Sequence, residues 1–184
     1  MSIELNEIII RDVQAQDMPA IKSIYELEVL HGISSWEDLP PSLDEMIERK
    51  NKVVQAGYPY RVACLGDQLL GYAYASAYRS RPAYRFTVEN SIYLADGVQR
   101  MGVGQKLLTD LVQQCEVRGF RQMIAVVGGS DNHVSINFHK KMGFEQVGLV
   151  KNIGHKFDQW LDSVMLQLPL GKAHKSAPGK LDKS

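Results

Sequence analysis

The sequence lacks the features that mark several classes of protein. It has two isolated cysteines, Cys64 and Cys115, which argues against a disulfide scaffold and against a zinc site. Lysine plus arginine equals aspartate plus glutamate, at 21 each, so no charge excess points to nucleic acid or to an anionic membrane. The apolar runs are too short to span a bilayer, and Glu4, Glu7 and Arg11 interrupt any signal-peptide core. These absences predict a soluble cytoplasmic protein that binds neither nucleic acid nor membranes.

The length and composition favour one globular domain. A chain of 184 residues can bury a sizeable core, and an apolar content of 45% with 23% charged residues is ordinary for such a fold. We expect the domain to span residues 1–168. The polar tail 169–184 carries Lys172, Lys175, Lys180 and Lys183 but almost no large apolar residue, so it is expected not to order.

Periodicity and turn signals predict a mixed α/β domain. The expected order is β-α-α-β-β-β-α-β-α-β-β. Ser42 and Glu45 match a capping box at the start of the second helix. The expected strands are 8–10, 60–65, 69–78, 86–94, 123–127, 145–150 and 157–168, and the expected helices are 17–30, 43–56, 103–118 and 134–142.

A glycine-rich loop before the third expected helix indicates a phosphate site. The first N–H groups of a helix lack partners, and glycines let a diphosphate approach them closely. Two nucleotide motifs do not fit. The P-loop needs Lys-Ser/Thr directly after its last glycine, where this chain has Gln105 and Lys106 after Gly104, and the dinucleotide fingerprint needs a glycine where Leu107 stands. A plain strand-to-helix turn is the alternative at this point.

Two segments resemble the signatures of a known superfamily. Gln99-Arg100-Met101-Gly102-Val103-Gly104 resembles the Gln/Arg-x-x-Gly-x-Gly/Ala loop with which GCN5-related N-acetyltransferases wrap the pyrophosphate of acetyl-CoA. The segment 130–144, which ends in Met-Gly-Phe, resembles their second signature, at about the expected separation. Segments 57–60, 71–75, 83–89 and 156–162 are similar to the phosphinothricin acetyltransferase family within that superfamily. Together these stretches cover most of residues 8–168.

The resemblance implies a fold and an activity. The fold would be a single-domain acetyltransferase fold, with a central mixed, mostly antiparallel sheet flanked by helices. The enzyme would move acetyl from acetyl-CoA to the α-amine of a glutamate-like amino acid, such as phosphinothricin, methionine sulfoximine or methionine sulfone. It also implies a homodimer, and no metal is expected.

Two residues are the expected catalytic groups. Glu89 matches the family's glutamate in Thr-Val-Glu and is the expected base, although a carboxylate needs a raised pKa or a water relay to deprotonate an amine. The alternative for Glu89 is an ion pair with Arg85 or Arg81. His139 stands where the superfamily often has a tyrosine that protonates the departing thiolate, and the phosphinothricin group commonly has histidine there. A structural histidine is the alternative.

The remaining expected site residues fall into two groups. Arg79 and Arg81 are expected to bind the substrate's carboxylate or its phosphinyl or sulfoximine oxygens, because guanidinium groups bind such oxygens in pairs. The substrate pocket is completed by Ser80, Asn90 and Ser91, with Tyr84 and Trp36 as further candidates. For the coenzyme, the resemblance implies Ile92, Tyr93 and Leu94 along the pantetheine arm, Arg100, Met101, Gly102, Val103, Gly104 and Gln105 at the pyrophosphate, and Asn132 and Ser135 near the thioester.

Other functions compete with this one. The same fold could acetylate another small amine or a protein N-terminus, but a polyamine would favour an acidic pocket, whereas Arg79 and Arg81 favour an anionic substrate. A non-catalytic acetyl-CoA-binding module would be expected to lack the base, and Glu89 is present. No cysteine lies in either signature, so we expect direct transfer within a ternary complex rather than an acyl-enzyme.

Overall fold

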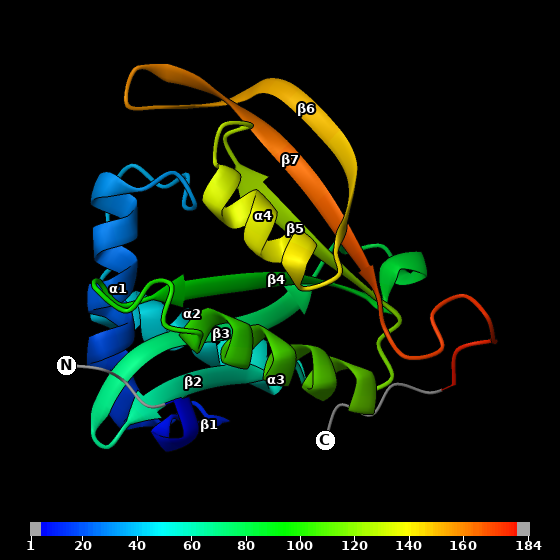
Figure 1. Cartoon of the computed structure of the whole chain (residues 1–184), viewed down its shortest axis with the longest axis horizontal. Helices are drawn as coiled ribbons and strands as arrows, with labels where there is room; N and C mark the ends of the chain where they lie inside the picture. The colour runs from blue at the N-terminus through cyan, green and yellow to red at the C-terminus, as the bar shows by residue number, and fades with distance from the viewer. Residues whose placement is uncertain (1–4, 180–184) are drawn as a thin grey trace.

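A seven-stranded sheet runs through the molecule in the order β1-β2-β3-β4-β5-β7-β6 (Figure 1). The computed structural model describes residues 5–179. Only β4 and β5 pair in parallel, and the other neighbours are antiparallel. The strands are β1 (Ile9–Asp12), β2 (Tyr60–Leu65), β3 (Gln68–Ala77), β4 (Thr87–Leu94), β5 (Gln122–Gly128), β6 (Glu145–Lys156) and β7 (Gln159–Pro169), and the helices are α1 (Met18–His31), α2 (Leu43–Gln55), α3 (Val103–Val117) and α4 (His133–Lys141). The predicted order of elements and the mixed, mostly antiparallel sheet are confirmed.

Local sequence explains where several helices begin. The Ser42 hydroxyl accepts a hydrogen bond from the Glu45 N–H at 3.1 Å, which satisfies one of the free donors of the first turn of α2. Asn132 caps α4 in the same way by accepting from the Ser135 N–H at 3.2 Å. Proline is tolerated in the first turn of α1 because its missing N–H would be unpaired there.

Helices cover both faces of the sheet and bury two apolar clusters. One cluster joins α3 and α4 to the sheet and includes Leu108, Leu111 and Val88. The other joins α1 and α2 to the opposite face and includes Ile21 and a set of tyrosines. Successive side chains of a strand point to opposite faces. As a result, β4 contributes to both clusters and lies between them.

The strands β6 and β7 form a long hairpin that reaches beyond the rest of the sheet (Figure 1). The predicted boundary between them is wrong, because β6 continues to Lys156 and the last strand begins at Gln159 rather than at Phe157. Phe157 and Asp158 both have positive φ, at 51° and 56°, and form the two-residue turn. Turns of this kind match the twist of paired strands.

The packing of the domain continues past residue 168. Leu170 is fully buried in the cluster under α3, and Ala173 is buried too. The end of the expected tail, 180–184, lies outside the described residues. No helix between residues 5 and 179 is both long and apolar enough to cross a membrane.

Candidate active site

The parallel strands β4 and β5 separate partway along their length. They pair from Thr87 opposite Gln122 as far as Asn90 opposite Ala125, whereas β3 continues to pair with β4 up to Leu94. In the part of the chain that the structure describes, the β4 backbone beyond Asn90 therefore has no strand on its β5 side. Unpaired backbone groups at such an edge can hydrogen-bond an extended ligand. We call this opening the β4–β5 fork.

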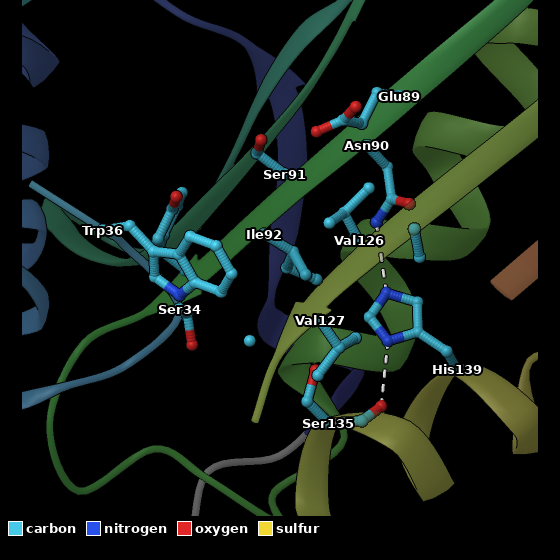
Figure 2. Close-up of a pocket in the computed structure, with 13 residues that line it drawn as sticks. Ser34, Trp36, Glu89, Asn90, Ser91, Ile92, Val126, Val127, Ser135 and His139 are labelled. Carbon is cyan, nitrogen blue, oxygen red and sulfur yellow. Dashed lines mark hydrogen bonds between the residues drawn. The ribbon is translucent and has the colours of Figure 1, made fainter. Parts of the chain in front are cut away.

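A cavity of about 270 Å³ fills the fork (Figure 2). Its walls come from four parts of the chain that lie far apart in the sequence. The lining residues are 89–93 of β4, 125–128 of β5, Ser135 and His139 of α4, and Ser34 and Trp36 of the connection between α1 and α2. The tertiary fold thus brings the expected Glu89, Asn90, Ser91, Ile92, Tyr93, Ser135 and His139 together in one site.

The carboxylate of Glu89 lies on the cavity wall, and no described residue forms an ion pair with it. Burial raises the pKa of Glu89 above its ordinary value near 4.5, because a buried site disfavours the charged form. Within residues 5–179 it has no ion pair or hydrogen-bond partner. Arg85 instead donates to the carbonyl of Pro82 and lies over the Phe86 ring. The alternative that Glu89 serves only as an ion-pair partner of Arg85 or Arg81 therefore finds no support in the contacts.

The side chains of β4 divide the cavity between the two faces of the sheet. Successive side chains of β4 point to opposite faces of the sheet, so Glu89 shares a face with Tyr93 and not with Asn90. Tyr93 packs against the α1–α2 cluster. Asn90 shares the other face with Ile92, which packs against the α3 cluster. Groups on the two faces can reach each other through the fork, where no strand closes the gap. Glu89 thus belongs to the α1–α2 side and His139 to the α3–α4 side.

His139 is buried in a short hydrogen-bonded chain (Figure 2). Its Nδ1 lies 2.9 Å from the Ser135 carbonyl and its Nε2 lies 3.2 Å from the Asn90 amide nitrogen. A carbonyl only accepts, so Nδ1 carries the proton, and in the neutral ring Nε2 accepts from Asn90. Burial lowers the pKa of His139, opposed in part by the bond to Ser135. The ring therefore favours its neutral form, with the lone pair at Nε2.

The Asn90 amide leaves one polar atom without a partner. Its Oδ1 is buried and makes no hydrogen bond with any described residue. Orphaned buried acceptors are rare in folded proteins, and a catalytic role is one of the reasons for which they are retained. The bond to His139 fixes the orientation of this amide.

The glycine loop opens α3 in the way the sequence predicts. Gly102 has a φ of 81° and is the residue just before the helix, and Arg100 has a φ of 65°. A side chain at Gly102 would be strained by this φ and would also meet Leu5. The first N–H groups of α3 lack helical partners, and the positive end of the helix dipole lies there. These N–H groups and the open β4 edge fit a ligand with an extended arm and a diphosphate.

The other expected coenzyme residues differ in their surroundings. Arg100, Met101 and Gln105 are exposed around the first turn of α3, whereas Val103 and Gly104 are buried. Asn132 is already used as the cap of α4, and its amide also donates to the Gly128 carbonyl at 3.3 Å.

The structure does not bring the expected substrate arginines into the cavity. Arg79, Ser80 and Arg81 are exposed and are not among its lining residues. The Arg79 guanidinium lies over the rings of Tyr78 and Tyr84, at 5.2 and 5.8 Å from their centroids. Their loop follows β3 close to the point where Ser76 pairs with Glu89. The arginines thus lie outside the cavity, on the connection between β3 and β4.

Several lining residues were not expected from the sequence. Ser34 and residues 126–128 carry no motif of their own, and they reach the cavity only because β5 diverges from β4 and the α1–α2 connection folds over the gap. The Gly128-Gly129 pair at the end of β5 was the one available signal. Trp36, a weaker candidate in the sequence, does line the cavity. Over residues 5–179 there is no group of three or more His, Cys, Asp or Glu side chains placed to hold a metal.

Comparison with known proteins identifies relatives along nearly the whole chain. Residues 10–165 match the acetyltransferase (GNAT) domain. The chain is 46% identical to a phosphinothricin N-acetyltransferase of Alcaligenes faecalis over 92% of this chain and 86% of that protein. It is 34% identical to an L-methionine sulfoximine/L-methionine sulfone acetyltransferase of Pseudomonas aeruginosa, covering 92% of this chain and 98% of the relative.

A solved structure agrees with these relatives. The GNAT superfamily phosphinothricin acetyltransferase from Sinorhizobium meliloti, in complex with AcCoA, has a TM-score of 0.90 at 44% identity, covering 94% of both chains.

Proposed function

The chain belongs to the GNAT acetyltransferase family and is an acetyl-CoA-dependent N-acetyltransferase, and from this premise we propose that it acetylates the α-amine of a glutamate-like amino acid. The proposed substrates are phosphinothricin, methionine sulfoximine and methionine sulfone. The names of the similar proteins support this class. We further propose that the acetyl group passes directly from donor to amine.

The observation that carries the proposal is the unpaired Glu89 carboxylate on the wall of the β4–β5 fork. An amine must lose a proton before it attacks a carbonyl carbon, and a base is effective when its pKa lies close to the working pH. Burial moves the pKa of Glu89 in that direction. In the proposed role, Glu89 accepts the ammonium proton directly or through a water molecule.

The coenzyme is proposed to lie along the open edge of β4. Acetyl-CoA supplies an activated acetyl group as a thioester. The backbone of Ile92, Tyr93 and Leu94 would bind its extended arm, and the N–H groups of residues 102–105 would bind its diphosphate, with Arg100 adding positive charge. Ser135 and Asn132 are proposed to lie near the thioester end.

His139 is proposed to return a proton to the leaving thiolate. Converting an ammonium to an amide releases two protons, so one can go to Glu89 and the second can reach the sulfur. A neutral His139 has its lone pair at Nε2, the atom that now accepts from Asn90, and can take up this second proton. Asn90 must then release Nε2, which makes the amide part of the proposed step.

The amino-acid specificity is proposed to depend on the arginines of the β3–β4 connection. Arg79 and Arg81 would bind the substrate's carboxylate or its phosphinyl or sulfoximine oxygens, with Ser80, Asn90 and Ser91 nearer the reacting amine. Among the lining residues within 5–179, Glu89 is the one carboxylate, which suits a single ammonium group better than a polyamine.

The expected homodimer is also part of the proposal. β6 is an edge strand of the sheet, and Val147, Leu149, Ile153 and Trp160 of the β6–β7 hairpin expose apolar side chains. Exposed edges and apolar patches are usual sites of association. Light scattering measures the mass in solution, and the mass of a single chain would contradict the dimer.

The proposed cytoplasmic location is supported by two free, buried cysteines, Cys64 and Cys115.

A turnover screen tests the substrate class. Release of free coenzyme A thiol is measured with methionine sulfone, methionine sulfoximine, phosphinothricin and a polyamine as acceptors. We expect release with at least one of the first three and none with the polyamine. Release with the polyamine alone would favour the alternative of another small amine. Binding of acetyl-CoA without turnover of any amine would favour a non-catalytic module.

A further inference from the structure

The connection between α1 and α2 is held by a residue more than 120 positions away. Lys156, the last residue of β6, is almost completely buried, at 4% exposed. Its ammonium donates to the carbonyl of Gly32 at 2.9 Å and to the carbonyl of Ser35 at 2.6 Å. Figure 1 shows the tip of the β6–β7 hairpin reaching over this connection. We call residues 32–36 the Trp36 loop.

The contacts of Lys156 belong to a larger set that fixes the Trp36 loop. Glu28 accepts from the Ser34 N–H at 2.7 Å, and the Tyr25 hydroxyl lies 3.0 Å from the Ser35 hydroxyl. Among these partners Lys156 is the one that comes from outside α1 and the loop. A buried ammonium is costly unless it is paired or well hydrogen-bonded, and here two carbonyls of the same loop accept from it. The loop is therefore tied to the hairpin at two backbone positions.

The Trp36 ring lies in a space that two glycines leave open. A Cβ at Gly154 of β6 would overlap the ring, and a Cβ at Gly128 of β5 would overlap its Nε1 and the carbonyl of Ile33. The Trp36 Nε1 donates to that same carbonyl at 3.1 Å. The ring thus packs against two strands of the sheet while it lines the cavity (Figure 2). Its position depends on where the loop is held.

We propose that Lys156 is a positioning residue for the amine substrate, acting through the Trp36 loop. By fixing the carbonyls of Gly32 and Ser35, it sets Ser34 and Trp36 on the cavity wall. The loop follows α1, on the side of the sheet that Glu89 faces, so it shapes the space in which the amine meets its base. This inference rests on the proposed function for its link to the amine, but the link between Lys156 and the loop stands on contacts alone.

The same hairpin holds the other side of the cavity with a different residue. Asp162 of β7 accepts from the Ser130 hydroxyl at 2.6 Å, and its carbonyl accepts from the Gly129 N–H at 2.8 Å. Its carboxylate also accepts from the Asn152 N–H at 2.9 Å. The bonds to Ser130 and Gly129 fix the turn between β5 and α4, next to the proposed coenzyme residues. Lys156 and Asp162 therefore hold different walls of the cavity from one hairpin. Substituting each residue alone separates the effect on the Trp36 loop from the effect on the β5–α4 turn.

Fluorescence quenching tests the loop without any substrate. The chain has two tryptophans, Trp36 and Trp160, so W160F leaves Trp36 as the only indole. In that background K156M is expected to raise the acrylamide quenching of Trp36 clearly above the parent, because the carbonyls of Gly32 and Ser35 lose their donor and the loop becomes more mobile. K151M is the matched control, since Lys151 is exposed on the same strand, and its quenching should equal the parent's.

Steady-state kinetics test the link to the amine. K156M is expected to raise the KM for the amino acid about tenfold, the size of effect expected when a positioning contact is lost, while the KM for acetyl-CoA stays within about twofold. D162N is expected to show the reverse pattern, with the larger change in the KM for acetyl-CoA. If K156M does not fold, G154A serves instead. It keeps Lys156 but displaces the Trp36 ring, and it should raise the same KM.

The outcomes separate the inference from the proposed function. Unchanged Trp36 quenching in K156M, or an equal rise of both KM values, would overturn the positioning role of Lys156. Failure of the wild-type protein to acetylate any of the amino acids would overturn the proposed substrate instead, and the quenching result would still decide whether Lys156 holds the loop.

Discussion

The two sides of the cavity are built in different ways. On the side proposed for the coenzyme, the main features arise within short segments: Gly102 is the residue before the first turn of α3, and Asn132 caps α4 by bonding to Ser135 three residues later. On the side proposed for the amine, the Trp36 loop depends on Lys156 and Gly154, over a hundred residues away. A local feature can be lost without affecting the opposite wall. A loop held by remote contacts is sensitive to changes in a distant hairpin.

The largest expected effect comes from Glu89, which lies on the amine side of the cavity. E89Q keeps the size of the side chain but removes the base, so turnover should fall by about 10²- to 10⁴-fold while acetyl-CoA binding is retained. Stopped-time thiol release and calorimetric titration with acetyl-CoA measure the two quantities. E145Q is the matched control, because Glu145 is exposed at the start of β6. Turnover by E89Q close to the wild-type rate would remove Glu89 as the base.

The pH dependence of the wild-type enzyme follows from the same group. Burial raises the pKa of Glu89, so its carboxylate takes up a proton at higher pH than a free glutamate does. Since the base acts only when deprotonated, kcat/KM should decrease as the pH falls through this raised pKa. In E89Q this acidic decrease should be absent. An identical acidic decrease in both proteins would assign it to another group.

A smaller effect is expected from the glycine loop, and it should be confined to the coenzyme. G102A places a Cβ at a φ of 81°, which costs about 1 kcal/mol for a non-glycine residue and distorts the start of α3. We expect acetyl-CoA to bind about fivefold more weakly, with the KM for the amino acid little changed. G179A is the control, because nothing lies near a Cβ built there. An equal loss for both substrates would show that the two sides are not separable.

The smallest effect is expected at the outer end of the amine side. Arg49 of α2 forms an ion pair with Glu37, which also accepts from the Tyr25 hydroxyl at 2.7 Å. Because both partners of the ion pair are partly exposed, R49M should lower the free energy of unfolding by less than about 1 kcal/mol. Urea denaturation measures this, and the difference from wild type should shrink further in high salt, where screening weakens the pair. A loss of several kcal/mol would place Arg49 in the support of the Trp36 loop.

Several elements could be predicted from the sequence because their causes are local. Ser42 and Glu45 marked a helix start, and the glycine loop marked the beginning of α3. The predicted start of the last strand was wrong, because Phe157 and Asp158 form a turn that requires positive φ at two residues that ordinarily avoid it. The geometry of this two-residue turn sets the register of the hairpin, and the apolar pattern of the two strands does not show which residues form the turn. The buried Leu170 likewise depends on a core that the tail composition does not reveal.

The sequence by itself determined the family, the order of the elements and most of the residues that meet in the cavity. Those features depend on local patterns: an open helix start, a capping residue and the alternation of side chains along β4. Only the tertiary structure decided that β4 and β5 separate after Asn90, that His139 is held between Ser135 and Asn90, and that Lys156 holds the Trp36 loop. Contacts between distant segments depend on how sheets and helices pack, and no single stretch of the chain carries that information.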